Sequence, residues 1–116
     1  MIETEIKNWL SAQGLVFSTK PETFAIDGDG PKPFIFSPTF KIENMSIEGR
    51  TIIVEPVMSF APQAGLRRVQ AFSRRFREKY YVVLIVKKRM LGRIPADAYD
   101  KLIVFEDLNN ARLTAE

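Results

Sequence analysis

The chain has 116 residues, of which 46% are hydrophobic and 27% are charged, and its formal net charge is +3. This length and composition predict one globular domain and not a disordered chain. The sequence contains no cysteine and no histidine, which excludes a disulfide framework, a thiolate metal site and the histidine-based nucleophile pairs of many hydrolases.

The N-terminal region predicts one helix followed by short strands. Residues 2–13 carry apolar side chains at helical spacing, and Gly14 is a plausible left-handed stop. Residues 15–17 and 24–26 are short apolar runs that fit brief strands. The segment 27–33 is rich in Asp, Gly and Pro and predicts a turn.

Two longer strands are predicted next, at 34–43 and 51–57, separated by a turn at Glu48-Gly49. Residues 34–43 alternate in character between two faces, as in a half-buried strand. On the first strand one face is predicted to hold Phe34, Phe36, Phe40 and Ile42. On the second strand Ile52 and Val54 share one face, while Ile53, Glu55 and Val57 share the other.

Residues 62–80 predict a long amphipathic helix. Its apolar stripe comprises Leu66, Val69, Phe72, Phe76 and Tyr80, at spacings of three and four. The run 81–86 is apolar throughout, which is typical of a central strand covered on both faces. A connection of this length between strands 51–57 and 81–86 fits a parallel, right-handed crossover.

The C-terminal region adds a buried strand at 102–105 and a short helix at 108–113. The predicted fold class is therefore α/β. We expect a mixed sheet with an antiparallel meander, a strand–helix–strand crossover and helices on both faces.

Charge is segregated along the chain. The window 66–93 holds ten basic residues and one acid, so it carries +9 while the remainder carries −6. The basic residues are Arg67, Arg68, Arg74, Arg75, Arg77, Lys79, Lys87, Lys88, Arg89 and Arg93. Clustered positive charge in a near-neutral protein is typical of a polyanion-binding surface. The residues predicted to contact DNA or RNA are Arg67, Arg68, Arg74, Arg75, Lys87, Lys88 and Arg89.

The order of elements, with residues 37–41 and 52–57 placed as they are, resembles the restriction-endonuclease-like family of PD-(D/E)xK nucleases. The family motif is Pro-Asp on one strand, then Glu or Asp, any residue and Lys near the end of the next. Here Ser37-Pro38-Thr39 takes the first position and Glu55-Pro56-Val57 takes the second. The resemblance covers residues 2–106 and implies a single restriction-endonuclease-like domain over residues 1–116.

The catalytic letters of this motif are mostly replaced. Thr39 stands where the family has Asp, and Val57 stands where it has Lys, so Glu55 alone is retained. Metal-dependent phosphodiester hydrolysis needs at least two carboxylates for Mg²⁺, a metal-activated water and a nearby cation. We therefore expect at most weak Mg²⁺ binding at Glu55 and no other cofactor.

An active nuclease with relocated residues stays open as an alternative. Lys41 follows Thr39 by two residues on the same strand face and could supply the amine, so Glu55 and Lys41 are the candidate catalytic residues. The other candidates are Arg67, Arg68 and Gln70 for the lysine position, and Glu3, Glu5 and Glu43 for a second carboxylate.

The favoured hypothesis is a catalytically degenerate nucleic-acid-binding domain that uses the basic helix and the loop after strand 81–86. A second alternative is a protein-interaction or scaffold domain whose basic helix meets an acidic surface, including that of its own copy in a homodimer. We expect a cytoplasmic protein, because cysteine is absent and the first residues lack a signal-peptide pattern. No apolar run reaches the length of about 18 residues that a membrane span needs.

Overall fold

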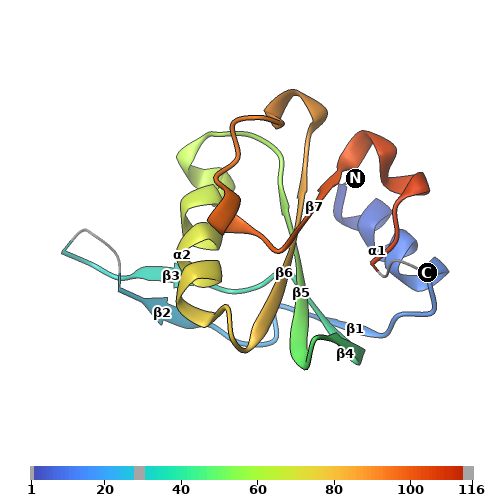
Figure 1. Cartoon of the computed structure of the whole chain (residues 1–116), viewed down its shortest axis with the longest axis horizontal. Coiled ribbons are helices and arrows are strands. Elements are labelled where there is room, and N and C mark those ends of the chain that lie inside the picture. The colour runs from blue at the N-terminus through green and yellow to red at the C-terminus, as the bar shows by residue number, and fades with distance from the viewer. Residues whose placement is uncertain (1, 28–30, 114–116) are drawn as a thin grey trace.

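The computed structural model describes residues 2–27 and 31–113, with only the backbone of Phe34. The predicted turn at 27–33 lies partly outside these residues, as does the predicted direction of the Phe34 side chain. A central sheet separates two layers (Figure 1), with helix α1 on one side and helix α2 on the other. The helices are α1 (Ile2–Ala12) and α2 (Leu66–Phe76).

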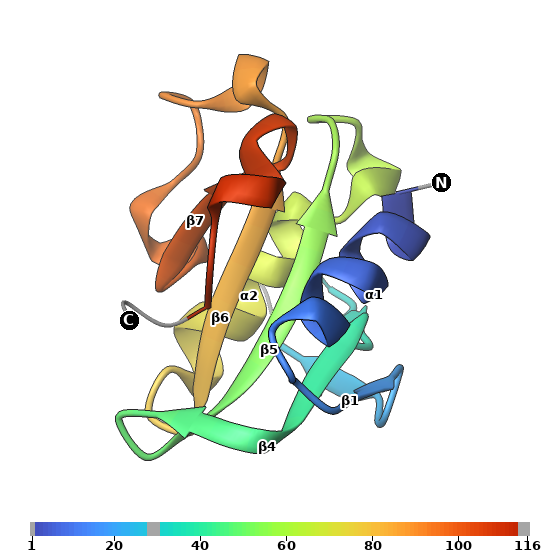
Figure 2. The same ribbon diagram turned by 90° about the vertical axis from the view of Figure 1, so that its right-hand side faces the viewer.

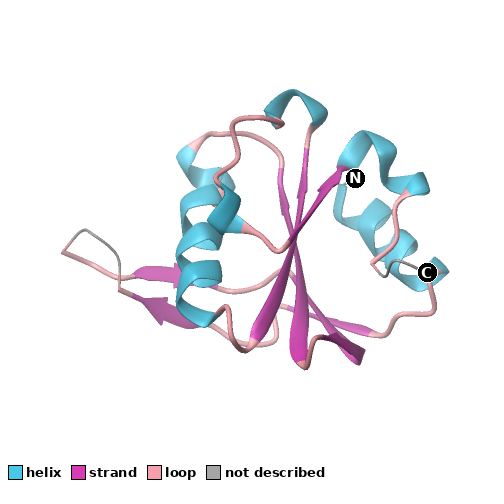
Figure 3. Ribbon diagram, in the orientation of Figure 1, coloured by secondary structure: helices cyan, strands magenta, loops and turns pink. Residues whose placement is uncertain are grey.

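Five strands form the central sheet in the order β1-β4-β5-β6-β7, and two more form a small separate sheet, β2-β3. Their bounds are β1 Phe17–Thr19, β2 Phe24–Ile26, β3 Phe34–Phe36, β4 Phe40–Ile47, β5 Arg50–Val57, β6 Tyr80–Val86 and β7 Lys101–Val104. Antiparallel pairing joins β1 to β4 and β4 to β5, while β6 runs parallel to both β5 and β7. Mixed pairing of this kind confirms the predicted α/β class, including the crossover through α2 (Figure 3).

Alternation along the strands divides the core into two layers. Ile52 and Val54 of β5 pack toward α1, in a cluster with Trp9 and Leu10. Ile53 and Val57 pack toward α2, in a cluster with Val69 and Phe72. The predicted faces of this strand are thus confirmed, and Glu55 lies on the α2 side.

The predicted strand 34–43 is two strands. β3 pairs with β2 in the small sheet, and β4 begins at Phe40 in the central sheet. Because the chain changes sheets around Pro38, Phe36 packs toward α2 while Phe40 packs toward α1. Their predicted common face is therefore wrong, since even spacing places residues on one face only along an unbroken strand.

The predicted helix 62–80 is shorter in the structure. A 3-10 turn at Pro62–Ala64 precedes Gly65, whose φ of 92° breaks the helix, and α2 ends at Phe76. Tyr80 already belongs to β6, yet its ring still packs on Phe72, at 5.1 Å between ring centroids. Apolar spacing could not reveal that α2 ends at Phe76, because Tyr80 continues the apolar stripe although it belongs to a strand.

Smaller shifts occur at the C-terminus. The last strand covers 101–104 instead of 102–105, and the last helical segment is a 3-10 helix at Phe105–Asn110 instead of 108–113. This segment packs beside α1 (Figure 2), where Trp9 Nε1–H donates to the Ala111 carbonyl at 2.8 Å. No helix in the described part of the chain is long and apolar enough to cross a membrane.

Candidate nucleic-acid interface and the Glu55 site

The two motif positions of the sequence meet in space. Thr39 immediately precedes β4 and Glu55 lies near the end of β5, and the two side chains touch. The Thr39 N–H donates to Glu55 Oε1 at 2.8 Å, and the Thr39 hydroxyl lies 2.6 Å from Glu55 Oε2. Both carboxyl oxygens of Glu55 therefore have a partner from the residue that stands at the family's aspartate position.

Glu55 is buried, with 9% of its surface exposed. Burial raises its pKa to about 7, although the two hydrogen bonds from Thr39 lower it. The negative charge of Glu3 raises this pKa further, and the positive charge of Lys20 lowers it. Glu55 is therefore close to half-protonated at neutral pH.

A small cavity of about 260 Å³ lies beside Glu55. Arg68 of α2, Ser37 and Gln63 contribute polar groups to its wall. Arg68 is thus the predicted replacement residue that shares a cavity with Glu55. Gln70 instead donates to Asp97 Oδ1 at 2.8 Å.

The candidates for a second carboxylate are dispersed. Glu3 acts on Glu55 through its charge, whereas Glu43 accepts a hydrogen bond from the Ser18 hydroxyl at 2.6 Å. Glu5 lines a larger cavity of about 690 Å³ against the C-terminal segment. Within residues 2–27 and 31–113, no three His, Cys, Asp or Glu side chains gather as a metal site would require. Glu55 with its threonine partner does not match the donor set that Mg²⁺ prefers, and weak binding there stays a prediction.

Lys41 lies on β4, opposite Ile53 of β5, and is half-buried. Its register places it on the same side of the sheet as Glu55. The cation that lowers the Glu55 pKa is nevertheless Lys20, just after β1. The Lys20 N–H donates to the Thr39 carbonyl at 3.2 Å, which brings the two segments together. Sequence reasoning missed Lys20, because an exposed lysine beside a proline carries no signal of a distant contact.

Most of the basic residues in window 66–93 reach the surface. Eight of the ten are exposed, and Arg68 and Lys87 are half-buried. They do not form one strip. Helix α2 runs back along the sheet from the carboxyl ends of β5 and β6 (Figure 1), so Arg67 and Arg68 begin it at that edge while Arg74, Arg75 and Arg77 lie toward its other end.

Neighbouring groups contact several of these cations. Arg74 Nε makes an exposed ion pair with Asp97 Oδ2 at 3.4 Å. The Lys88 N–H donates to Glu106 Oε1 at 2.9 Å, and this bond, with the charges of Lys87 and Lys88, holds the pKa of Glu106 below its usual range. The Lys87 Nζ lies over the Phe105 ring, 4.9 Å from the ring centroid. Because Phe105 packs against the core on the α1 side of the sheet, the Lys87 side chain lies on that side.

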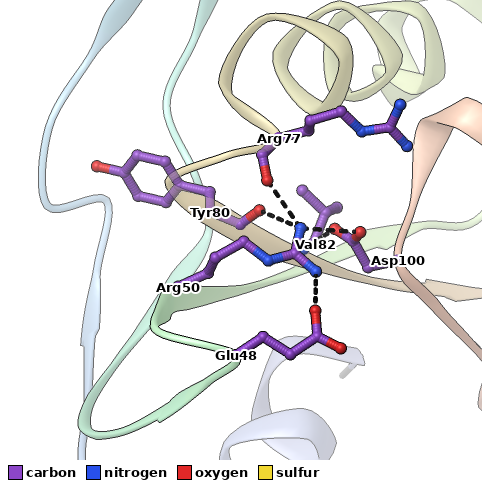
Figure 4. Close-up of polar contacts among 6 residues, drawn as sticks. All are labelled: Glu48, Arg50, Arg77, Tyr80, Val82 and Asp100. Carbon is purple, nitrogen blue, oxygen red and sulfur yellow. Dashed lines mark hydrogen bonds and ion pairs between the residues drawn. The ribbon is translucent and has the colours of Figure 1, made fainter.

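A half-buried ion pair between Arg50 and Asp100, near the amino ends of the parallel strands, was also missed. Arg50 donates to the Arg77 carbonyl at 2.8 Å and pairs with Asp100 Oδ1 at 3.1 Å and with Glu48 Oε1 at 2.6 Å (Figure 4). Asp100 Oδ2 in turn accepts the Val82 N–H at 2.8 Å. This cluster joins three connections of the sheet and has a structural role. Arg50 and Asp100 lie 50 residues apart in the sequence and follow no motif spacing.

Comparisons of the chain with protein-family models, with curated proteins and with solved structures found no match. The resemblance to PD-(D/E)xK nucleases therefore stays a prediction from the sequence.

Proposed function

We propose that this chain binds nucleic acid through the exposed face of α2 and the loop after β6, and that it is a catalytically degenerate relative of the nucleases it resembles. The observation that carries the proposal is the exposed face of α2. Arg67, Arg74 and Arg75 of α2 and Arg77, which follows its last residue, are exposed, and the first turn contains no acid. Guanidinium groups in this number suit phosphate oxygens, to which they donate paired hydrogen bonds.

The Glu55 site supports the second part of the proposal, that the chain lacks nuclease activity. Glu55 offers a single carboxyl group, and both of its oxygens are already hydrogen-bonded to Thr39, which makes it a weak Mg²⁺ ligand. We expect no nicking of supercoiled plasmid with millimolar Mg²⁺ or Mn²⁺. Metal-dependent nicking that disappears in Glu55→Gln would instead establish the active-nuclease alternative.

Salt-dependent binding tests the proposal. Fluorescence anisotropy with a labelled DNA should give an affinity that falls steeply between about 50 and 200 mM salt. Binding releases counterions from the phosphates, and this release is less favourable at higher salt. Removing two contacting cations, in Arg75→Gln/Arg77→Gln, should weaken binding and make the log–log salt slope shallower by about 2.

The matched control removes the same charge from the other side of the sheet. Lys7 and Arg112 are exposed, on α1 and in the C-terminal segment, so Lys7→Gln/Arg112→Gln should keep the wild-type slope. Equal weakening by both double variants would show that net charge acts without a defined surface. Absence of binding at low salt would overturn the proposal and favour the scaffold alternative, which a self-association measurement would then address.

A further inference from the structure

Two loops meet at the carboxyl edge of the central sheet and combine exposed apolar and cationic side chains. One loop follows β5 and contains Met58 and Phe60, and the other follows β6 and contains Arg89, Leu91 and Arg93. Because β5 and β6 are parallel and in register to Val57 and Val86, both loops leave the sheet at the same end (Figure 2). We call the set Phe60, Lys88, Arg89, Leu91 and Arg93 the edge surface.

Specific contacts hold these loops together. Arg89 Nη2–H donates to the Met58 carbonyl at 3.4 Å, and the Arg93 guanidinium lies 4.5 Å from the centroid of the Phe60 ring. Met90 anchors the second loop, since its side chain is completely buried. The edge surface is thus supported from within and does not depend on a free loop.

Apolar side chains of this surface face solvent. Phe60 is 36% exposed and Leu91 is 42% exposed, among the large hydrophobic residues most open to water in the described chain. Lys88, Arg89 and Arg93 are exposed beside them. A planar ring stacked with a guanidinium group, surrounded by further cations, suits a partner that combines flat apolar faces with regular negative charge.

We propose that the edge surface binds single-stranded nucleic acid by stacking a base on the Phe60–Arg93 pair while Lys88 and Arg89 contact adjacent phosphates. The inference rests on the proposed function and names its substrate class. Bases of a single strand unstack from one another at a small cost in free energy, and any base can stack on an aromatic ring, so the interaction does not require a particular sequence. In a duplex the base faces are already covered by neighbouring base pairs, so a ring has no free face to contact.

The test separates stacking from charge by comparing two oligonucleotides. One is an oligothymidine of about 12 nucleotides, which is within the length that such sites cover. The other has the same length and phosphates but abasic sugars. Phe60→Ala should weaken oligothymidine binding by about 5- to 100-fold and leave abasic binding unchanged. Phe60→Trp should restore binding, because it retains a flat aromatic face.

Val16→Ala is the matched control, since Val16 is 58% exposed and lies beside β1, away from the edge surface. Unchanged thermal melts of Phe60→Ala would show that folding is intact. Equal binding of oligothymidine by Phe60→Ala and wild type would overturn the inference. If Arg75→Gln/Arg77→Gln still weakened binding in that case, the proposed function would survive. Failure of wild type to bind either oligonucleotide would overturn the inference, and failure to bind duplex DNA at low salt as well would overturn the proposed function.

Discussion

The buried Glu55 predicts that the stability of this protein falls as pH rises through neutrality. Its pKa is about 7 in the folded chain, against an ordinary value of 4.5. Below the ordinary value the carboxyl is protonated in both states. Between the two values the unfolded chain loses the proton while the folded chain keeps it, so the free energy of unfolding decreases with pH. Above the folded-state pKa the loss is complete.

The pKa difference gives the magnitude. Each pH unit corresponds to about 1.4 kcal/mol, so ionisation of Glu55 costs the folded state about 3 kcal/mol in total. Glu55→Gln removes this cost, because the Gln carbonyl can accept the Thr39 N–H while its amide donates to the Thr39 hydroxyl. The variant should match wild type near about pH 4 and exceed its free energy of unfolding by up to about 3 kcal/mol above about pH 8.

Urea denaturation across this pH range measures the effect, with Trp9 fluorescence and circular dichroism as probes. Subtracting the two free energies of unfolding at each pH isolates Glu55 from all other titrating groups. Glu78→Gln, which changes an exposed glutamate in the turn after α2, provides the control and should parallel wild type. A wild-type curve that runs parallel to that of Glu55→Gln at every pH would refute the reasoning.

Further substitutions test the same structure. Thr39→Val removes the hydroxyl hydrogen bond that lowers the Glu55 pKa. In the same urea series, the decrease in the free energy of unfolding should therefore extend to higher pH in this variant than in wild type. The same pH dependence in both proteins would contradict this. Arg50→Ala leaves the Asp100 carboxylate without its cationic partner and should destabilise by about 2–3 kcal/mol in thermal melts. A loss no larger than in an exposed-arginine variant would show that the ion pair is dispensable. Phe72→Ala removes the ring that packs against the rings of Phe24, Phe36, Phe76 and Tyr80. This change should cost about 3–5 kcal/mol in urea, whereas a much smaller loss would mean that the remaining rings repack.

Hydrophobic spacing predicted the fold where an element keeps one environment along its length. Strand β6 follows from an apolar run, and the faces of β5 follow from the two-residue repeat of an extended strand. The predicted elements are wrong where the chain leaves one strand or helix while the hydrophobic spacing continues unchanged. Pro38 separates β3 from β4 although the spacing of Phe36 and Phe40 is even, and Tyr80 extends the helical stripe from a strand.

The candidate site was predictable only in part. The resemblance assigned Thr39 and Glu55 to the two motif positions, and the structure brings the two residues into hydrogen-bonding contact. The pKa of Glu55 could not be predicted, because it depends on burial and on the charges of Glu3 and Lys20, which lie far away in the sequence. Charge segregation identified the basic window, but the side of the sheet that Lys87 reaches follows only from its contact with Phe105.

Chemical-shift mapping tests the central claim of nucleic-acid binding most directly. ¹⁵N-labelled protein is titrated with a short single-stranded DNA at low salt. The account predicts shifts in the exposed residues of α2 and in the two loops of the edge surface, with little change around Lys7 and Arg112. Shifts confined to the α1 side of the sheet, or no shifts at all, would contradict it.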